Sequence, residues 1–190
     1  GAVCRVDASD ASDSIEGAGS VTNGAGSGFV TLATNMVSSL NKPYSGVMAD
    51  GANASLAFVK SRTCKLTLTG VSTYSGGTTL TAGTLTLGSS ERLLNTGVVN
   101  ISGGTFALGT FNQTVGSLNI TGGQVTGTGT LTSSSYVINT PVGDITTLDT
   151  LITGTTQINK TGAGLLILTG NNTYTGGTVL TGGTLNLGSA

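Results

Sequence analysis

One internal duplication constrains the fold of this 190-residue chain more than any other feature. Residues 66–88 read LTLTGVSTYSGGTTLTAGTLTLG and residues 166–188 read LILTGNNTYTGGTVLTGGTLNLG, with sixteen of the 23 positions identical. The correspondence extends upstream, where Lys60 aligns with Lys160. Self-similarity of this kind is the signature of architectures in which one structural unit packs against copies of itself.

A shorter period runs inside the long one. Alternating apolar pairs recur along the chain, and their spacing predicts short strands with one buried face. These apolar pairs are Leu66-x-Leu68, Leu85-x-Leu87, Phe106-x-Leu108 and, after a shorter interval, Leu118-x-Ile120. Glycine pairs separate the strands and permit the positive φ that tight corners need. They are Gly76-Gly77, Gly103-Gly104, Gly122-Gly123, Gly176-Gly177 and Gly182-Gly183.

Two architectures accommodate many short strands, an antiparallel sandwich or barrel and a parallel solenoid. An antiparallel sheet needs hairpin pairs joined by short turns. Here the corners instead repeat the same residue types at the same places, as expected when like stacks on like. The sequence therefore predicts an all-β parallel β-helix (a β-solenoid) with about 20 residues per rung, with Leu, Val and Ile inside and Thr, Ser and Asn outside.

The N-terminal part of the chain differs, because ten of the fifteen charged residues lie within the first 65. Solenoid ends expose an open core, so terminal repeats are usually atypical caps. We expect residues 1–55 to form an atypical N-terminal cap or irregular first rungs, and residues 56–190 to form the solenoid with its two long repeats. Within the first part, residues 31–40 (TLATNMVSSL) are compatible with one short helix.

Composition and charge exclude several functions. The net charge is −1 and no basic stripe is present, so nucleic-acid binding has no support. No apolar run is long enough for a transmembrane helix, and no signal peptide is recognisable. Histidine is absent, which removes the commonest general base and metal ligand. We predict no catalytic, cofactor-binding or metal-binding residues, no cofactor, and no enzymatic activity.

Four groups of residues are candidate sites, and each has a plainer interpretation. Asp144 and Asp149 could form a glycosidase-like acid pair, but no basic partner is near them in sequence. The acidic run of Asp7, Asp10, Asp13 and Glu16 lacks the order of a calcium loop and is typical of a solvated terminus. Lys60, Arg62 and Lys65 could activate Cys64, although such clusters are usually solvated. Tyr74 and Tyr174 could stack on sugars, but packing over a Gly-Gly corner is favoured.

The segment TGNNTYTGGTVLTGGTLNLG resembles the autotransporter-associated β-strand repeat of bacterial passenger domains, as does LTLTGVSTYSGGTTLTAGTLTLG. The resemblance covers about residues 56–190. It implies a right-handed parallel β-helix at the bacterial cell surface, acting as an adhesin, stalk or spacer. The first copy departs at Arg62 and Cys64, where the second copy has Gly162 and Gly164.

In that secreted setting the two cysteines, Cys4 and Cys64, are predicted to form a disulfide, with unpaired thiols as the alternative. The first functional hypothesis is a non-catalytic adhesive or structural module of an autotransporter-like surface protein, with a host or cell-surface glycan or protein as partner. The second is an extracellular filament subunit that self-associates end to end through uncapped solenoid ends. A polysaccharide-active enzyme is the remote third.

Overall fold

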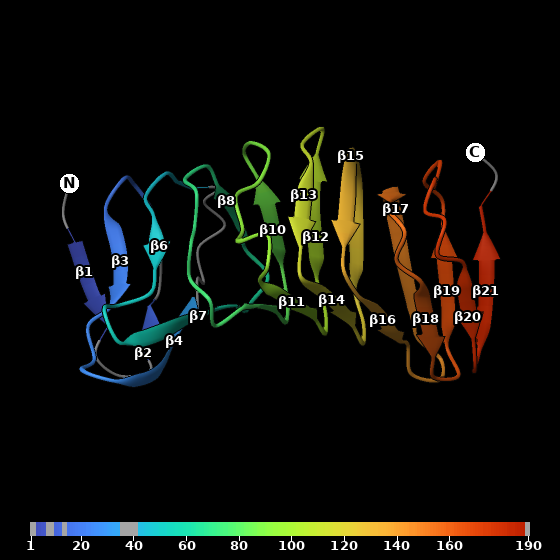
Figure 1. Ribbon diagram of the computed structural model, residues 1–190, viewed down its shortest axis with the longest axis horizontal. Helices are drawn as coiled ribbons and strands as arrows, with labels where there is room; N and C mark the ends of the chain where they lie inside the picture. The colour runs from blue at the N-terminus through green and yellow to red at the C-terminus, as the bar shows by residue number, and fades with distance from the viewer. Residues whose placement is uncertain (1–2, 7–9, 13–14, 35–41, 189–190) are drawn as a thin grey trace.

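The computed structural model describes residues 3–6, 10–12, 15–34 and 42–188, and every strand pairing in it is parallel (Figure 1). The described residues contain strands and no helix. Consecutive turns of the chain stack side by side, and the two termini lie at opposite ends of the stack. The predicted all-β parallel solenoid is confirmed.

The strands form one short sheet and two long sheets. The short sheet contains β1 (Val3–Val6), β3 (Ser20–Asn23) and β6 (Met48–Ala49). The first long sheet contains β2 (Asp10–Ser12), β4 (Gly28–Thr34), β7 (Ala54–Lys60), β9 (Thr78–Leu80), β11 (Val98–Ile101), β14 (Ser117–Ile120), β16 (Tyr136–Asn139), β18 (Ile158–Thr161) and β20 (Thr178–Leu180). The second long sheet contains β5 (Lys42–Tyr44), β8 (Lys65–Leu68), β10 (Thr84–Leu87), β12 (Thr105–Gly109), β13 (Gln113–Val115), β15 (Gln124–Ser133), β17 (Ile145–Thr153), β19 (Leu165–Leu168) and β21 (Thr184–Leu187).

The register gives the length of a turn directly. In the second long sheet Leu66 pairs with Leu85, and Leu85 pairs with Phe106 in the following turn. Phe106 in turn pairs with Val125, so the apolar pairs of the sequence recur once in every turn. The shorter interval to Leu118 is a change of sheet, because Leu118 belongs to β14 of the first long sheet. The predicted length of a rung is confirmed.

The two glycines of each pair have different structural roles. The second glycine of each pair has a positive φ: Gly77, Gly104, Gly123, Gly177 and Gly183. The first glycine lies against the preceding turn; a Cβ at Gly76 would be 2.5 Å from the Leu56 carbonyl oxygen. The corners therefore need glycine for close approach at the first position and for backbone conformation at the second.

Apolar side chains from both long sheets fill the interior. Strand after strand shows alternating burial, as in β10, where Leu85 and Leu87 are buried between outward-facing threonines. Some threonines also point inward, and they are hydrogen-bonded there: the Thr140 hydroxyl is 3.0 Å from the Thr146 hydroxyl, and Thr150 donates to the Gly129 carbonyl at 2.7 Å. The prediction that threonine lines the outside is correct for most strands but does not hold for these inward-pointing threonines. A hydroxyl can be buried without a large loss of free energy only when it has a hydrogen-bond partner.

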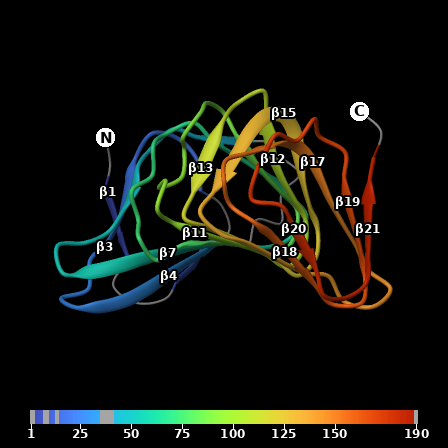
Figure 2. The same cartoon turned by 45° about the vertical axis from the view of Figure 1, so that its right-hand side comes forward.

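Two of the N-terminal turns are longer than the rest. Val21 pairs with Met48 and Val30 pairs with Leu56, and both partners are further apart in sequence than Leu66 and Leu85 are. These turns include the short sheet, and in Figure 2 the long strands β4 and β7 extend to one side of the stack. The division at residue 55 stays a prediction, although the first long sheet runs without interruption from β2 to β20.

The short helix expected over residues 31–40 is wrong in its first part. Residues 31–34 belong to β4, whose residues Val30, Leu32 and Thr34 are buried in alternation and pair with β7. The pairing with β7 supplies backbone hydrogen bonds and burial that one isolated helical turn would lack. Residues 35–40 lie outside the described residues.

Candidate functional site

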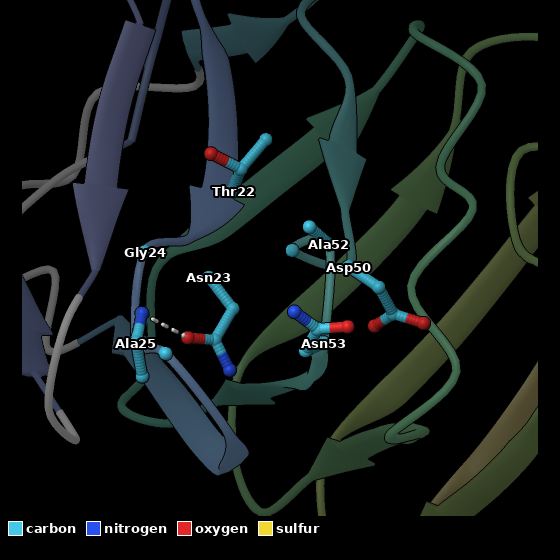
Figure 3. Close-up of a pocket in the computed structure, with 9 residues that line it drawn as sticks. Thr22, Asn23, Gly24, Ala25, Asp50, Ala52 and Asn53 are labelled. Atoms are coloured by element: carbon cyan, nitrogen blue, oxygen red, sulfur yellow. Dashed lines mark hydrogen bonds between the residues drawn. The ribbon is translucent and has the colours of Figure 1, made fainter.

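A polar hollow of about 410 Å³ opens between two stacked loops near the N-terminal end of the solenoid (Figure 3). One loop follows β3 and the other follows β6, so they occupy the same corner in consecutive turns. The lining residues are Thr22, Asn23, Gly24, Ala25, Gly26, Asp50, Gly51, Ala52 and Asn53.

The two loops have similar sequences, Asn23-Gly24-Ala25 and Asp50-Gly51-Ala52. Thr22 pairs with Ala49, which places Asn23 and Asp50 at equivalent positions. The Asn23 Oδ1 accepts from the Ala25 N–H at 2.9 Å, forming a local turn, and its Nδ2 donates to the Ser55 carbonyl at 2.7 Å. A Cβ at Gly51 would overlap the Asn23 carbonyl oxygen, so this stacking requires glycine.

Asp50 ties its loop to the following turn. Its Oδ1 accepts from the Leu56 N–H at 2.7 Å and from the Ser75 N–H at 3.0 Å, and its Oδ2 is 3.1 Å from the same Ser75 nitrogen. Burial alone would raise the pKa of Asp50, but the hydrogen bonds from Ser75 and from the Leu56 N–H outweigh it and lower that pKa. Asp50 is therefore a structural carboxylate that stays ionised.

The chemistry of the hollow suits a neutral polar ligand. Its walls include several glycines and alanines, and its most exposed polar side chain is Asn53, which lies between Asn23 and Asp50 in Figure 3. An amide both donates and accepts, as recognition of hydroxyl or amide groups requires. Sequence reasoning missed this site, although the repeated Asx-Gly-Ala was the signal that could have found it.

Two lysines are completely buried, at equivalent positions of the two copies. Lys60 and Lys160 are each 0% exposed. Lys60 Nζ donates to the carbonyl oxygens of Ser61 at 2.8 Å, Arg62 at 2.9 Å and Ala82 at 3.4 Å.

Lys160 repeats this arrangement. Its Nζ donates to the carbonyl oxygens of Thr161 at 2.6 Å, Gly162 at 2.8 Å and Gly182 at 3.2 Å. In both copies the third carbonyl belongs to the next turn, so each ammonium joins two turns. Burial lowers the pKa of both lysines, and at Lys60 the neighbouring Cys64 opposes that effect.

The expectation of a solvated basic cluster is therefore wrong for Lys60 and correct for the exposed Arg62. A lysine is rarely buried unless its charge is matched, and the corner supplies that match with carbonyl oxygens. Arg62 adopts a φ of 64°, where the second copy has Gly162 with a φ of 72°. The backbone conformation that wraps the ammonium is thus the same in both copies.

Cys64 is buried next to this corner. Cys4 pairs with Val21 and Val21 pairs with Met48, so Cys4 lies two strand spacings, about 9–10 Å, from the turn that contains Cys64. A disulfide needs Cα atoms within about 7 Å. The side chain of Cys4 lies outside the described residues, so the Cys4–Cys64 bridge stays a prediction, to be tested by non-reducing peptide mass spectrometry.

Asp144 and Asp149 do not form a catalytic pair. Asp144 immediately precedes β17 and Asp149 lies within it, so five extended residues, about 16 Å, separate them. Paired glycosidase carboxylates lie about 5–9.5 Å apart. The Asp149 carboxylate instead accepts a hydrogen bond from the Thr169 hydroxyl at 2.9 Å.

The two tyrosines pack as expected. Tyr74 is buried, its ring centroid is 6.3 Å from that of Phe58, and its hydroxyl is 2.6 Å from the Thr78 hydroxyl. Tyr174 makes the same contact to Thr178 at 2.6 Å and is partly buried. Packing is confirmed, and Tyr74 is not available to stack on a sugar.

The acidic N-terminal run lies largely outside the described residues, which include the whole of Glu16 but only the backbone of Asp10. Across the described ranges no group of three metal-ligating side chains comes together. The same ranges contain no helix with the length and apolarity to cross a membrane.

Comparison with known proteins agrees with this geometry. Residues 65–87 and 158–187 match the family model described as passenger-associated-transport-repeat. Over 112 residues, or 57% of this chain, the sequence is 38% identical to the adhesin BmaC autotransporter of Brucella suis biovar 1 (strain 1330). The chain spans about 3% of that adhesin's length. No solved structure matches the chain significantly.

The matched segments coincide with the two duplicated copies, and each supplies strands to both long sheets. The chain is therefore a β-solenoid that contains two passenger-associated-transport repeats, and the resemblance stated from the sequence is confirmed for these segments.

Proposed function

We propose that this chain is a non-catalytic adhesive module, displayed at the bacterial cell surface as part of a larger autotransporter-like protein. The observation that carries the proposal is the pair of passenger repeats at residues 65–87 and 158–187, each forming part of one continuous solenoid. The similar protein is named as an adhesin, which supports adhesion over enzymatic activity.

The polar hollow is the surface we assign to ligand contact. The Asn53 amide faces outward there, whereas Asn23 and Asp50 are committed to hydrogen bonds within the fold. A partner rich in hydroxyl or amide groups, such as a cell-surface glycan or an exposed loop of a host protein, matches this chemistry.

Binding by microspheres coated with the purified chain tests the adhesive part of the proposal. Coated microspheres should be retained on host epithelial cells or on immobilised glycans above the level of uncoated ones. Ala52→Arg, at an exposed residue that lines the hollow, should reduce retention about tenfold by filling it. Val142→Arg, at an exposed residue of the loop before β17, is the matched control and should have no effect.

Two results would count against this function. Retention of coated microspheres at the level of uncoated ones would remove adhesion, and equal loss in both arginine variants would remove the hollow as the contact surface. The enzymatic alternative has its own assay, because release of reducing ends from a panel of pectins and glycans would contradict a non-catalytic module.

A further inference from the structure

A second groove, of about 350 Å³, lies on the surface across the turns that contain β15, β17 and β19, which are neighbours in the second long sheet (Figure 1). The pairing of β15 with β17 shifts register between Thr126 and Thr130, so the backbone bulges there and the groove opens beside the bulge. Its lining includes Gly127, Thr128, Asp149, Leu151, Gly170 and Asn171.

Asp149 is the ionisable side chain of this groove, and it is exposed. Its Oδ1 accepts from the Thr169 hydroxyl at 2.9 Å, and within the described residues its Oδ2 has no hydrogen-bond partner. The exposed Asn171 is held beside it, because the Oδ1 of the following Asn172 accepts from the Ile152 N–H at 2.9 Å. A carboxylate oxygen and an amide therefore line the same groove and are free to bind a ligand.

No basic side chain of this region is available to pair with Asp149. The charged residues of positions 93–190 are Asp144, Asp149 and Lys160. Lys160 is completely buried and donates to three carbonyl oxygens. The surface charges of the described residues 93–188 are therefore both negative, and a carboxylate on such a surface is complementary to a cation.

The first copy contains the same corner with the same backbone contacts. The Thr69 N–H donates to the Tyr44 carbonyl at 2.9 Å. In the second copy the Thr169 N–H donates to the Leu148 carbonyl at 3.2 Å. The residues that follow Tyr44 and Leu148 are therefore structurally equivalent, and the two corners can be compared residue by residue.

The polar residues of the groove are not required by this corner. Ser45 is equivalent to Asp149, and its hydroxyl donates to the Gly17 carbonyl at 3.1 Å. Val71 is equivalent to Asn171. Val71 is 47% exposed although a further turn follows it, so the exposure of this position comes from the outward direction of the side chain. The second copy thus carries a carboxylate and an amide where the fold accepts serine and valine.

We propose that the groove around Asp149 binds an arginine or lysine side chain of a partner protein. Leu151 and the glycine backbone contact the apolar stem, while the Asp149 carboxylate and the Asn171 side-chain oxygen accept from the charged head. The first copy offers no second site of this kind, because it lacks the carboxylate and because Arg92 Nη1 already donates to the Thr69 carbonyl at 2.7 Å. The proposal is independent of the polar hollow and of the adhesive function.

A peptide titration followed by NMR of the ¹⁵N-labelled chain tests this site. The probe is acetyl-Gly-Arg-Gly-amide, and its control has citrulline in place of arginine, which keeps the shape of the side chain without its charge. The variants are Asp149→Asn and Asn171→Val, the second of which installs the residue of the first copy. The matched control is Asp144→Asn, which removes the same charge from an exposed residue outside the groove.

The arginine peptide should shift the amide resonances of residues 127–128, 149–151 and 170–173, with the weak affinity of one exposed ion pair. Asp149→Asn should weaken binding by at least about fivefold and Asn171→Val by about twofold. Asp144→Asn should bind as the parent does. Added salt should weaken binding to the parent, because the carboxylate is exposed. Unchanged resonances elsewhere verify that each variant is folded.

Three results would overturn the proposal. The first is equal binding of the arginine and citrulline peptides, or the absence of shifts in the groove at about 50 mM peptide. The second is equal weakening by Asp149→Asn and Asp144→Asn, which would show that the net charge and not the groove attracts the peptide. The third is a shift of the groove resonances by methyl glucoside and not by the arginine peptide, which would assign the groove to a neutral saccharide.

Discussion

The two copies of the repeat have nearly the same sequence and the same fold, yet they differ in burial. In residues 66–88 the inward-facing leucines are buried between neighbouring turns, whereas in residues 166–188 two of the equivalent leucines are largely exposed. The sequence of a turn determines which side chains face inward, and the next turn determines whether they are buried. Stability in such a stack is accordingly a sum of turn and interface contributions.

The largest difference is expected from truncating equivalent leucines. Leu87→Ala should lower the free energy of unfolding by about 3 kcal/mol, because it leaves a cavity between turns. Leu187→Ala should change it by no more than about 0.5 kcal/mol, because that side chain is already exposed. Urea denaturation of both variants measures the difference, and equal losses would contradict the burial argument.

The buried lysines are a feature that the copies share. Lys160→Met keeps the apolar stem but leaves three carbonyl oxygens without the ammonium, and we expect a loss of about 2 kcal/mol. Lys60→Met should behave in the same way. Lys65→Met, at a half-buried residue nearby, is the control, with an expected change within about 0.5 kcal/mol. A Lys160→Met protein as stable as the parent in thermal unfolding would show that the ammonium does not hold the turns together.

Asp50 distinguishes the environments of the copies. The Ser75 N–H of the first copy binds the Asp50 carboxylate, whereas the Thr175 N–H of the second binds the Gly154 carbonyl at 2.9 Å. Because the pKa of Asp50 is lowered in the folded state, its stabilising contribution is present above the unfolded pKa and is lost as pH falls through the folded pKa.

Asp50→Asn should therefore be less stable than the parent by about 1 kcal/mol at pH 7, and the difference should shrink as pH falls through the folded pKa of Asp50, which lies below its ordinary value. Urea titrations at a series of pH values measure this dependence. Gly154→Ala provides no carboxylate and should leave the pH profile unchanged, and a difference for Asp50→Asn that persists at low pH would contradict the assignment.

The smallest expected effect concerns a backbone conformation. Arg62 occupies the left-handed region where the second copy has glycine. Arg62→Gly should relieve that strain and raise the free energy of unfolding by about 0.5–1 kcal/mol, partly offset by the flexibility of glycine in the unfolded chain. Calorimetry measures the shift. A loss of stability would show that the Arg62 side chain contributes more than its backbone conformation costs.

Much of the fold could be predicted because the repeat encodes it locally. The glycine pairs were predicted to permit positive φ, and the second glycine of each pair does so. Alternating leucines predicted the strands and their buried faces. The duplication predicted stacking of equivalent residues, which is also seen on the surface, where the Asn119 Nδ2 donates to the Asn100 Oδ1 at 2.9 Å.

Other features depend on contacts with neighbouring turns and could not be predicted from the sequence. Lys60 was expected on a solvated face because lysine usually lies there, and only the converging carbonyl oxygens make its burial favourable. Asn23 and Asp50 precede glycine, as ordinary turn residues do, and their stacking into one hollow depends on the register of β3 and β6. Neither register nor carbonyl direction can be read from residue types alone.

Parallel stacking of equivalent residues is the central claim, and engineered disulfides test it most directly. In a chain with Cys4 and Cys64 replaced by serine, Asn100→Cys with Asn119→Cys joins two paired positions of β11 and β14. Asn100→Cys with Val137→Cys spans two strand spacings, because Asn119 pairs with Val137. Oxidation should link the first pair, whose Cα atoms lie about 4.8 Å apart, and leave the second pair unlinked. Failure of the first pair to link, or equal linking of both pairs, would contradict the parallel solenoid.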